Sequence, residues 1–321
     1  MPPAGSPRPG KAAALRPRFW AVGLLGLVAA LSAGCEDERQ SIGRLDAVWA
    51  RRGISDGRFQ KPRAMAIDHQ ERIYVVDMTA RIQVFDCEGR FLHGWRTPEH
   101  EFGKPTGLAV ARDGRILVAD THYYRVLIYS PEGELLETLG GTQGERPGEF
   151  NLVTDVVEDS EGNLYVGEYG EYDRIQKFTA DGRFLLQWGG HGSQPGQFIR
   201  PQSLVVDEDD RIWVADACNH RIQVFDGEGG LLQVWGTPGG AVGELYYPYD
   251  VILAQDGSVF VAEFGNHRIQ RFTRDGRSLG VWGSNGREEG QLSHPWALVE
   301  DARGRIHVLD TGNHRVQTVR M

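Results

Sequence analysis

The chain contains one unit, 43 to 49 residues long, six times over. Each copy has an apolar segment that ends in an acid, then a short loop, then an arginine that begins a second apolar segment. The acids are Asp77, Asp120, Glu168, Asp216, Glu263 and Asp310. The arginines are Arg81, Arg125, Arg174, Arg221, Arg268 and Arg315. A repeat of this length is typical of a four-stranded propeller blade, so it predicts one closed ring rather than the two domains that 321 residues suggest on length alone.

Hydrophobic alternation and turn residues divide each copy into four strands. In the fourth copy we expect strands over 203–206, 212–215, 221–225 and 231–235, separated by short polar or glycine-containing turns. Hairpin turns such as Asp113-Gly114 need a positive φ, which glycine adopts without strain. The turns therefore account for many of the 42 glycines in the chain.

The two ends of the repeat complement each other. The sixth copy stops at 316–320, after its third strand, and lacks the closing strand with its tryptophan. That strand is found at the other end as 45–53, which resembles 231–236. We therefore expect the N-terminal segment to complete the last blade, so that no unpaired edge remains between the first and last blades. Residues 44–321 are predicted to form a single all-β domain, a six-bladed β-propeller of four-stranded antiparallel blades.

These motifs resemble the NHL repeat, which is named for an Asn-His-Leu-like core. Here that core reads Asn219-His220-Arg221-Ile222, Asn266-His267-Arg268-Ile269 and Asn313-His314-Arg315-Val316. The resemblance covers roughly residues 44–321, because six copies agree in spacing. It implies a six-bladed β-propeller, in agreement with the number of copies.

Residues 1–35 are typical of an export signal rather than of a folded segment. Four basic residues precede an apolar stretch, 19–33, that is short for a bilayer span, and Ala33-Gly34 leads directly to Cys35. This ending resembles the lipobox of bacterial lipoproteins. The resemblance implies a lipid anchor on Cys35, a tether over 36–43, and an exported envelope protein at the periplasmic face or the cell surface. An ordinary signal peptide with an incidental Cys35 and a plain transmembrane anchor are the alternatives.

The charge balance of the chain shifts once this leader is set aside. The whole sequence has 35 basic and 44 acidic residues; all of the acids follow Cys35, but only 31 of the basic residues do, which leaves about −13. Phosphate contacts need clustered lysine and arginine, so no nucleic-acid partner is expected. Cys87 and Cys218 are too few for a disulfide framework, and we expect them to remain unbonded.

Features that recur in every copy are interpreted as scaffold, and differences between copies as candidates for function. The recurring acid and arginine are expected to form an ion pair that fixes a turn, and the Asn-His pairs have the same status. In a propeller, the loops before the first strand and between the second and third strands lie on one face and rim the channel. The residue after each copy's proline, or its equivalent, reads Arg63, Thr106, Thr154, Gln202, Tyr249 and Trp296.

The loops between the second and third strands also differ between copies, and some of them contain tyrosines. Tyrosine and tryptophan are favoured binding anchors, because they combine apolar area with a polar tip. We therefore predict a ligand-binding face, the alternative being that its tyrosines pack between neighbouring loops. The face comprises Arg63, Thr106, Tyr123, Tyr124, Tyr169, Tyr172, Gln202, Tyr249 and Trp296.

A related architecture is the amidating lyase that cleaves peptidyl-hydroxyglycine. In that family three histidines, each following a blade proline, hold a zinc ion in the channel. The matching positions here contain no histidine, and His294 precedes its proline, so the zinc site does not carry over. The family's channel calcium uses an aspartate in the place that Asp155 and Asp250 occupy here. The resemblance thus implies a channel Ca²⁺ on these two residues, the alternative being hydrogen bonds to strand amides.

No residue of the chain is assigned a catalytic role, because no other catalytic or cofactor motif is present. We expect a non-catalytic, monomeric scaffold, held at the membrane through its lipid alone, that binds a protein, a peptide or a glycan. Calcium is its candidate cofactor. The alternative is a lyase or hydrolase related to the amidating lyase, using the channel mouth without that family's zinc histidines.

Overall fold

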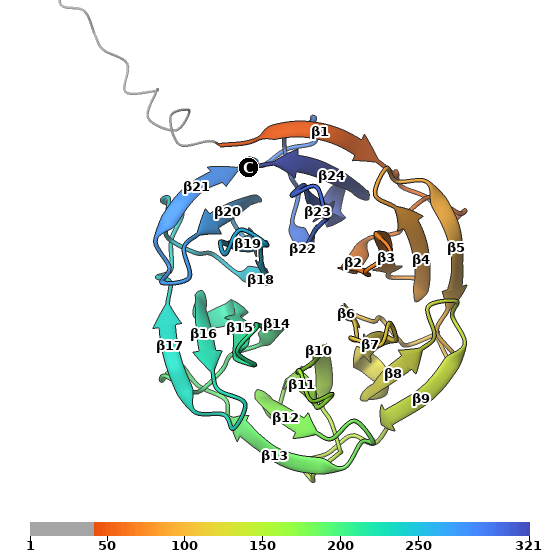
Figure 1. Cartoon of the computed structure of the whole chain (residues 1–321), viewed down its shortest axis with the longest axis vertical. Coiled ribbons are helices and arrows are strands. Elements are labelled where there is room, and N and C mark those ends of the chain that lie inside the picture. Colours follow the sequence, from red (N-terminus) through yellow and green to blue (C-terminus); the bar gives the residue numbers. More distant parts are fainter. Residues whose placement is uncertain (1–41) are drawn as a thin grey trace, which may run out of the picture. The chain divides into compact units, whose positions relative to one another are not determined.

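Six four-stranded antiparallel sheets stand around a central axis, which confirms the predicted all-β, six-bladed propeller (Figure 1). The computed structural model describes residues 42–321. The predicted signal segment 1–35 with Cys35, and most of the tether 36–43, lie outside the described residues. Within 42–321, no helix has the length and apolar character needed to cross a bilayer.

The first three blades follow one another along the chain, each running from its innermost to its outermost strand. Blade 1 consists of β2 (Pro62–Ile67), β3 (Arg72–Asp77), β4 (Arg81–Asp86) and β5 (Phe91–Arg96). Blade 2 consists of β6 (Gly107–Val110), β7 (Ile116–Asp120), β8 (Arg125–Tyr129) and β9 (Leu135–Gly140). Blade 3 consists of β10 (Leu152–Glu158), β11 (Leu164–Tyr169), β12 (Arg174–Phe178) and β13 (Phe184–Gly189).

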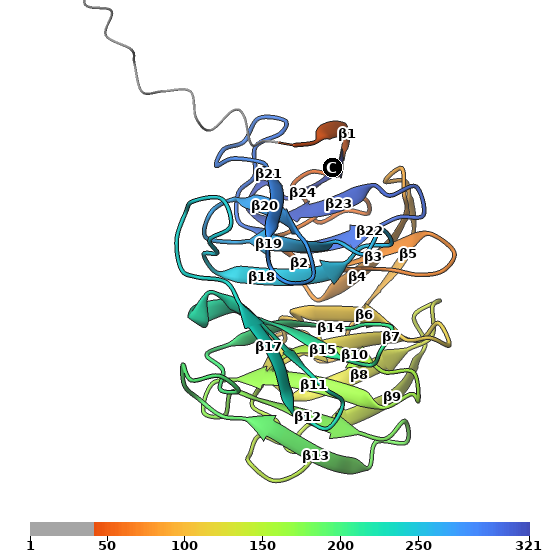
Figure 2. The same ribbon diagram turned by 60° about the vertical axis from the view of Figure 1, so that its left-hand side comes forward.

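The last three blades continue the ring, and in Figure 2 the sheets are seen from the side. Blade 4 consists of β14 (Pro201–Val206), β15 (Ile212–Asp216), β16 (Arg221–Phe225) and β17 (Leu231–Trp235). Blade 5 consists of β18 (Pro248–Leu253), β19 (Val259–Glu263), β20 (Arg268–Phe272) and β21 (Ser278–Trp282). Blade 6 consists of β22 (Pro295–Glu300), β23 (Ile306–Asp310), β24 (Arg315–Arg320) and β1 (Arg44–Trp49). The four strands predicted for the fourth copy are confirmed, with β14 beginning two residues earlier and β15 ending one residue later.

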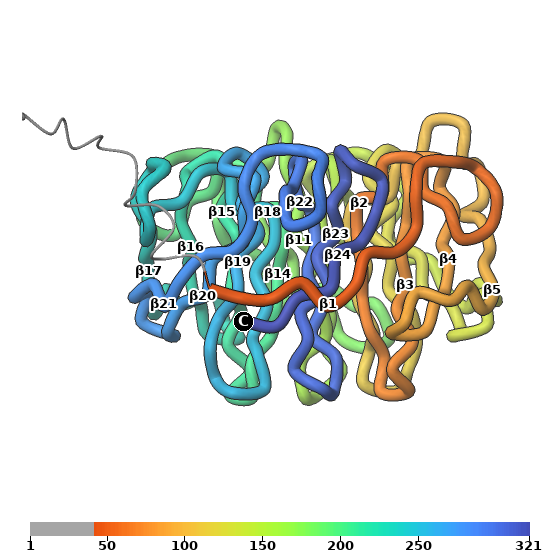
Figure 3. The backbone as a smooth tube through the Cα atoms, turned by 90° about the horizontal axis from the view of Figure 1, so that it is seen from above, coloured from red at the N-terminus to blue at the C-terminus, as the bar shows by residue number. Residues whose placement is uncertain are grey.

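The N-terminal strand closes the ring, as the displaced repeat predicted. Strand β1 pairs antiparallel with β24, from Arg44 opposite Arg320 to Trp49 opposite Val316. Figure 3 shows the two segments running side by side, although they come from opposite ends of the chain. The last blade is therefore complete, and the ring has no gap between its ends.

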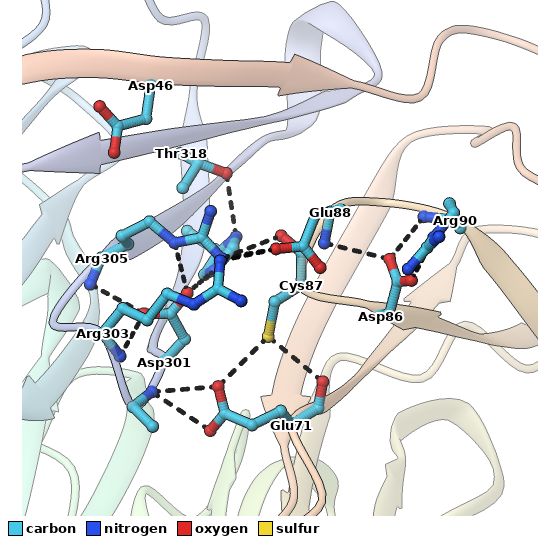
Figure 4. Close-up of polar contacts among 12 residues, drawn as sticks. Asp46, Glu71, Asp86, Cys87, Glu88, Arg90, Asp301, Arg303, Arg305 and Thr318 are labelled. Carbon is cyan, nitrogen blue, oxygen red and sulfur yellow. Dashed lines mark hydrogen bonds and ion pairs between the residues drawn. The ribbon is translucent and has the colours of Figure 1, made fainter.

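Polar contacts join blade 6 to blade 1 at the face opposite the channel mouth described below (Figure 4). The Glu71 carboxylate accepts the backbone N–H of Ala302 at 3.1 Å. Glu88 pairs with Arg303 at 2.9 Å and with Arg305 at 3.4 Å. The first and last blades are thus held together by side chains as well as by the shared strand.

Apolar side chains fill the space between adjacent blades. Trp188 on β13 contacts Tyr165 of its own blade, with ring centroids 6.0 Å apart, and Phe225 of blade 4, at 5.8 Å. Phe225 also packs on Phe198, in the connection between these blades, at 5.5 Å. The repeated aromatic positions are therefore inter-blade packing, as expected for features that recur.

The recurring acid and arginine form a buried ion pair in every blade. In blade 4, Asp216 has no exposed surface and accepts hydrogen bonds from Arg221 Nε at 2.8 Å and from the Ile199 N–H at 2.9 Å. The other guanidinium nitrogens of Arg221 donate to loop carbonyls, those of Ser193 and Gln197, each at 2.8 Å. The pair therefore attaches the connecting loop to the strand ends, which confirms its role in the scaffold.

The histidines of the Asn-His pairs connect neighbouring blades. His220, His267 and His314 each have a left-handed backbone, with φ between 55° and 59°. Their Nδ1 atoms accept the N–H of Tyr247, His294 and Lys61 in the next connection, at 2.9–3.0 Å. Each imidazole is thus a neutral acceptor, and burial lowers the pKa of all three below the ordinary 6.5.

Blade 2 departs from this plan at its connecting loop. Phe102 matches the repeat in sequence, yet it is 72% exposed, whereas Phe198 at the same place in blade 4 is fully buried. In blade 4 the connecting loop is held by Gln223, whose side chain bonds the Gly196 N–H and the Gln197 carbonyl. Leu127 occupies the position of Gln223 in blade 2 and cannot make these bonds. The loop of blade 2 therefore presents its phenylalanine to solvent.

Replacing Asp216 with Asn removes the charge that neutralises Arg221 but preserves the side-chain shape. Removing one partner of a buried pair leaves an uncompensated charge, so the free energy of unfolding should fall by about 3–5 kcal/mol, measured by urea denaturation. Arg90→Ala is the control, because it removes an exposed pair with Asp86 and should cost about 1 kcal/mol or less. Equal losses in the two variants would contradict the structural role of the buried pair.

Acid should weaken the histidine bonds between blades. A histidine with a lowered folded pKa takes up its proton more readily in the unfolded chain. Its contribution is therefore complete above about pH 6.5 and is lost as the pH falls through the folded pKa. As the pH falls from about 7 to about 5, we expect the Tm of His314→Asn to rise relative to that of wild type, since Asn tolerates a positive φ and does not titrate. His69→Asn, at an exposed histidine, is the control, and an unchanged slope in H314N would count against the assignment.

Candidate functional site

Five of the predicted ring residues meet at the mouth of the central channel, where they line one cavity of about 30 Å³. They are Arg63, Thr106, Gln202, Tyr249 and Trp296. Each lies at the start of an innermost strand or directly before it, so neighbouring blades aim one side chain each at the axis. The sixth ring position, Thr154, does not line this cavity, and its Oγ1 donates to the Pro201 carbonyl of the next blade at 2.5 Å.

One half of the mouth is aromatic. Tyr249 stacks on Phe264 with centroids 4.2 Å apart and meets Trp296 edge to face at 4.9 Å. The Arg63 guanidinium carbon lies 5.4 Å from the centre of the Trp296 ring. Edge-to-face and stacked pairs of this kind fix the rings in one arrangement, so this half of the mouth is preorganised.

A second arginine lies beside this aromatic group. The Arg200 guanidinium carbon is 4.8 Å from the ring centre of Tyr169 and 5.2 Å from that of Tyr249. Its Nε donates to Gln202 Oε1 at 2.8 Å. Arginine held between aromatic faces in this way keeps the edges of its guanidinium group for other partners.

The other half of the mouth consists of threonines that bond within the fold. The hydroxyls of Thr106 and Thr121 are 2.8 Å apart, and Thr106 Oγ1 also donates to the Thr154 carbonyl at 3.2 Å. In the last blade, Thr311 Oγ1 donates to the Pro62 carbonyl at 2.8 Å. These hydroxyls serve contacts between blades, so the aromatic half carries the features suited to a ligand.

Three predicted tyrosines lie away from this cavity. Tyr123 stacks with Arg125, 4.7 Å from its guanidinium carbon, and Tyr124 packs against the core between blades 2 and 3. Tyr172 lines a separate cavity of about 230 Å³ on blade 3, beside Glu145. Of the predicted tyrosines, Tyr249 and Tyr169 therefore belong to the mouth, and the other three lie elsewhere on the structure.

Two residues of the mouth were not predicted from the sequence. Arg200 directly precedes a blade proline, and its left-handed φ of 63° is shared by the equivalent residues Lys61, Tyr247 and His294. Phe264 follows the acid of blade 5, as Tyr169 follows that of blade 3. Both positions vary from copy to copy, so comparing them across the six copies could have identified both residues.

Asp155 and Asp250 lie at a neck below the mouth. They line both the mouth cavity and a second cavity of about 260 Å³, which is otherwise mostly apolar. Asp155 accepts the N–H of Leu204 at 2.9 Å, and Asp250 accepts the N–H of Leu298 at 2.7 Å, each from the next blade. Burial raises the pKa of Asp250 to about 6 and that of Asp155 well above its usual range. The structure favours the alternative of bonds to strand amides, while a channel Ca²⁺ stays a prediction.

A group with metal-binding side chains lies at the opposite face, in the contact between blades 6 and 1. Cys87, Asp301 and His307 are buried and close together; Figure 4 shows Cys87 and Asp301. Asp301 already accepts Arg305 Nε at 2.6 Å and bonds His307 Nε2 at 3.1 Å. Asp207 holds Arg211 and Trp213 in the same way in blade 4, so the Asp301 contacts repeat a feature of the scaffold. Cys87 and Cys218 are both free, as predicted.

Comparison with known proteins supports the repeat and the fold. A family model for the NHL repeat matches residues 102–129 and 198–225, so the chain carries NHL repeats. It is 31% identical over 189 residues to peptidylglycine alpha-amidating monooxygenase of Rattus norvegicus, covering 56% of this chain and 18% of that protein. It is 30% identical over 161 residues to NHL repeat-containing protein 3 of Mus musculus, covering 45% of each. The chain thus spans less than half the length of these curated relatives.

Solved structures show the same architecture. A streptogramin B lyase superposes with a TM-score of 0.62 at 16% identity, covering 86% of this chain and 97% of that chain. A virginiamycin B lyase from Staphylococcus aureus superposes with a TM-score of 0.59 at 14% identity, covering 83% and 98%. At these identities the likeness establishes the propeller fold and leaves function to the site itself.

Ionisation of Asp250 should cost stability. Its folded pKa of about 6 lies above the ordinary 3.8, so the folded chain holds a proton that the unfolded chain has released, and stability falls as the pH rises through this window. We expect Asp250→Asn, which cannot ionise, to gain relative to wild type from about pH 4 to pH 7, by about 3 kcal/mol at most. Urea denaturation at each pH measures the difference, with the exposed Asp56→Asn as control. A difference that does not vary with pH would contradict the raised pKa.

Proposed function

We propose that this chain is a non-catalytic scaffold that binds a protein or peptide ligand at the channel mouth. The observation that carries the proposal is the contrast between the repeated scaffold and the mouth. There, successive blades contribute different side chains, and aromatic rings gather with two guanidinium groups. Tyrosine, tryptophan and arginine contribute most of the binding free energy at protein interfaces.

The rigidity of the mouth also favours ligand binding. Its side chains project from strands and loops that the buried ion pairs hold in place, as Arg221 does through the Ser193 and Gln197 carbonyls. A preorganised surface loses little conformational entropy when a ligand binds. The cavity of about 30 Å³ admits only a small group, so a ligand would lie across the face and insert one group into the mouth.

The proposal extends to where the protein acts. The leader that resembles a lipobox supports export and lipid attachment at Cys35, with the propeller as a monomer in the cell envelope. In that setting the ligand would be another envelope protein, a peptide or a glycan, and the net charge near −13 argues against nucleic acid.

A lyase or hydrolase is the second candidate. Alignment with an amidating monooxygenase and with a probable peptidyl-alpha-hydroxyglycine alpha-amidating lyase of Caenorhabditis elegans favours it. Against it, the ring positions that would supply zinc ligands contain no histidine; they are Arg63, Thr106, Thr154, Gln202, Tyr249 and Trp296. Metal analysis of the purified full-length protein separates the two candidates, because stoichiometric zinc would favour the enzyme.

Capture of a partner from native envelope tests the scaffold. Full-length tagged protein is compared with the double variant Tyr249→Ala/Trp296→Ala, and the partner is then titrated against both. We expect the double variant to weaken binding at least tenfold, because it removes the aromatic half of the mouth. Tyr172→Ala is the matched control, since Tyr172 lies outside the mouth, and urea denaturation confirms that each variant is folded. Equal binding by wild type and a folded double variant would refute the proposal.

A further inference from the structure

We propose that the channel mouth recognises a carboxylate, which Arg63 and Arg200 bind together. This inference rests on the proposed function and names the group that the ligand inserts. It starts from two half-buried guanidinium groups that lie at the same mouth and form no ion pair among the described residues.

The six repeating arginines show how this fold normally treats such a group. Each is paired with the acid of its own blade, at nitrogen–oxygen distances of 2.5–2.9 Å. Arg63, in contrast, makes no side-chain hydrogen bond or ion pair within residues 42–321, and Arg200 bonds only the neutral amide of Gln202. In a chain with 44 acidic residues, two half-buried arginines without an acidic partner form a local positive site.

The charged and polar groups around Arg63 also favour the binding of an anion. The groups that act on its guanidinium are Arg200, Tyr169 and Tyr249, none of them a carboxylate. Burial lowers the pKa of Arg63, and the like charge of Arg200 adds to this effect. Burial lowers the pKa of His122, and the charges of Lys104 and Arg63 lower it further. An anion between the two guanidinium groups would relieve their repulsion and replace the hydration that burial removes.

The geometry leaves room for a planar anion. The guanidinium carbons of Arg63 and Arg200 lie over aromatic rings, and neither arginine uses its N–H groups on a carboxylate of the described residues, so these N–H groups stay available for two parallel bonds to an external carboxylate. Gln202 lines the cavity with its Oε1 engaged by Arg200, while its Nε2 makes no hydrogen bond in the described part of the chain. The mouth therefore offers donors on several sides.

Two acids also line this cavity, and their hydrogen bonds and pKa values affect how strongly they repel an anion nearby. Oxygens of Asp155 and Asp250 accept the N–H groups of Leu204 and Leu298. Because burial raises their pKa values, these carboxyls lose their charge at a higher pH than exposed carboxylates do. A volume of about 30 Å³ suits a carboxylate, with the rest of the ligand resting on Tyr249 and Trp296.

The test titrates the full-length protein with phenylacetate and with its neutral analogue phenylacetamide, following tryptophan fluorescence and heat. We expect phenylacetate to bind at least tenfold more tightly, and Arg63→Gln or Arg200→Gln to remove this preference. Arg58→Gln is the matched control, because Arg58 is also half-buried without an acidic partner but lies on an outer loop. Equal binding of acid and amide, or an undiminished preference in a folded Arg63→Gln protein, would overturn the proposal. Tighter binding of phenyl phosphate than of phenylacetate would also overturn it.

Three peptides then identify the source of the carboxylate. One has a free C-terminus and no acidic side chain, one is amidated with an internal glutamate, and one is amidated without any acid. Binding of the first or the second identifies a chain end or a side chain, and equal binding of all three overturns the inference. Its failure is distinguishable from failure of the proposed function. A partner whose capture depends on Tyr249 and Trp296, but not on Arg63, would leave the scaffold standing without the carboxylate.

Discussion

The buried pair of an acid and an arginine in each blade is the interaction on which the rest of the structure depends. Charges removed from water destabilise a protein unless they are paired and their remaining hydrogen-bonding groups are satisfied. Arg221 meets both conditions, because it neutralises Asp216 and donates its remaining N–H groups to carbonyls of the connecting loop. The hydrogen bonds that stabilise this buried pair therefore also fix two loops of each blade at the mouth face. These are the loop before the innermost strand and the loop between the second and third strands.

A scaffold fixed in this way can vary its innermost residues without losing the fold. The residue after each blade proline, or its equivalent, differs between most blades, while acid, arginine and aromatic packing repeat. Arg63 and Arg200 differ from the six repeating arginines, each of which is neutralised by the acid of its own blade. Leaving them without an acid costs stability and gains a site that an external anion can complete.

Most of the fold could be predicted from the sequence, because aligning the repeated copies shows where each blade begins and ends. The blade number, the strand order and the displaced strand that ends at Trp49 all follow from aligning six copies. The site was less predictable, since a repeat position does not specify a side-chain direction. Tyr169 ends β11 and Tyr172 lies in the loop that follows, yet only Tyr169 reaches the mouth. Phe102 matches Phe198 in sequence but is exposed, in a connection that is three residues shorter and lacks the glutamine that holds the loop in blade 4.

The two acids at the neck below the mouth affect both the contacts between blades and the binding of an anion at the mouth. Asp155 and Asp250 each reach across to the next blade, so the innermost strands depend on carboxyls that burial discourages from ionising. Ionised carboxylates there repel an anion at the mouth, and this repulsion weakens as the pH falls toward the raised pKa of Asp250, about 6. Because an anion at the mouth would in turn favour the protonated forms, occupancy of the mouth and protonation of the neck should reinforce each other.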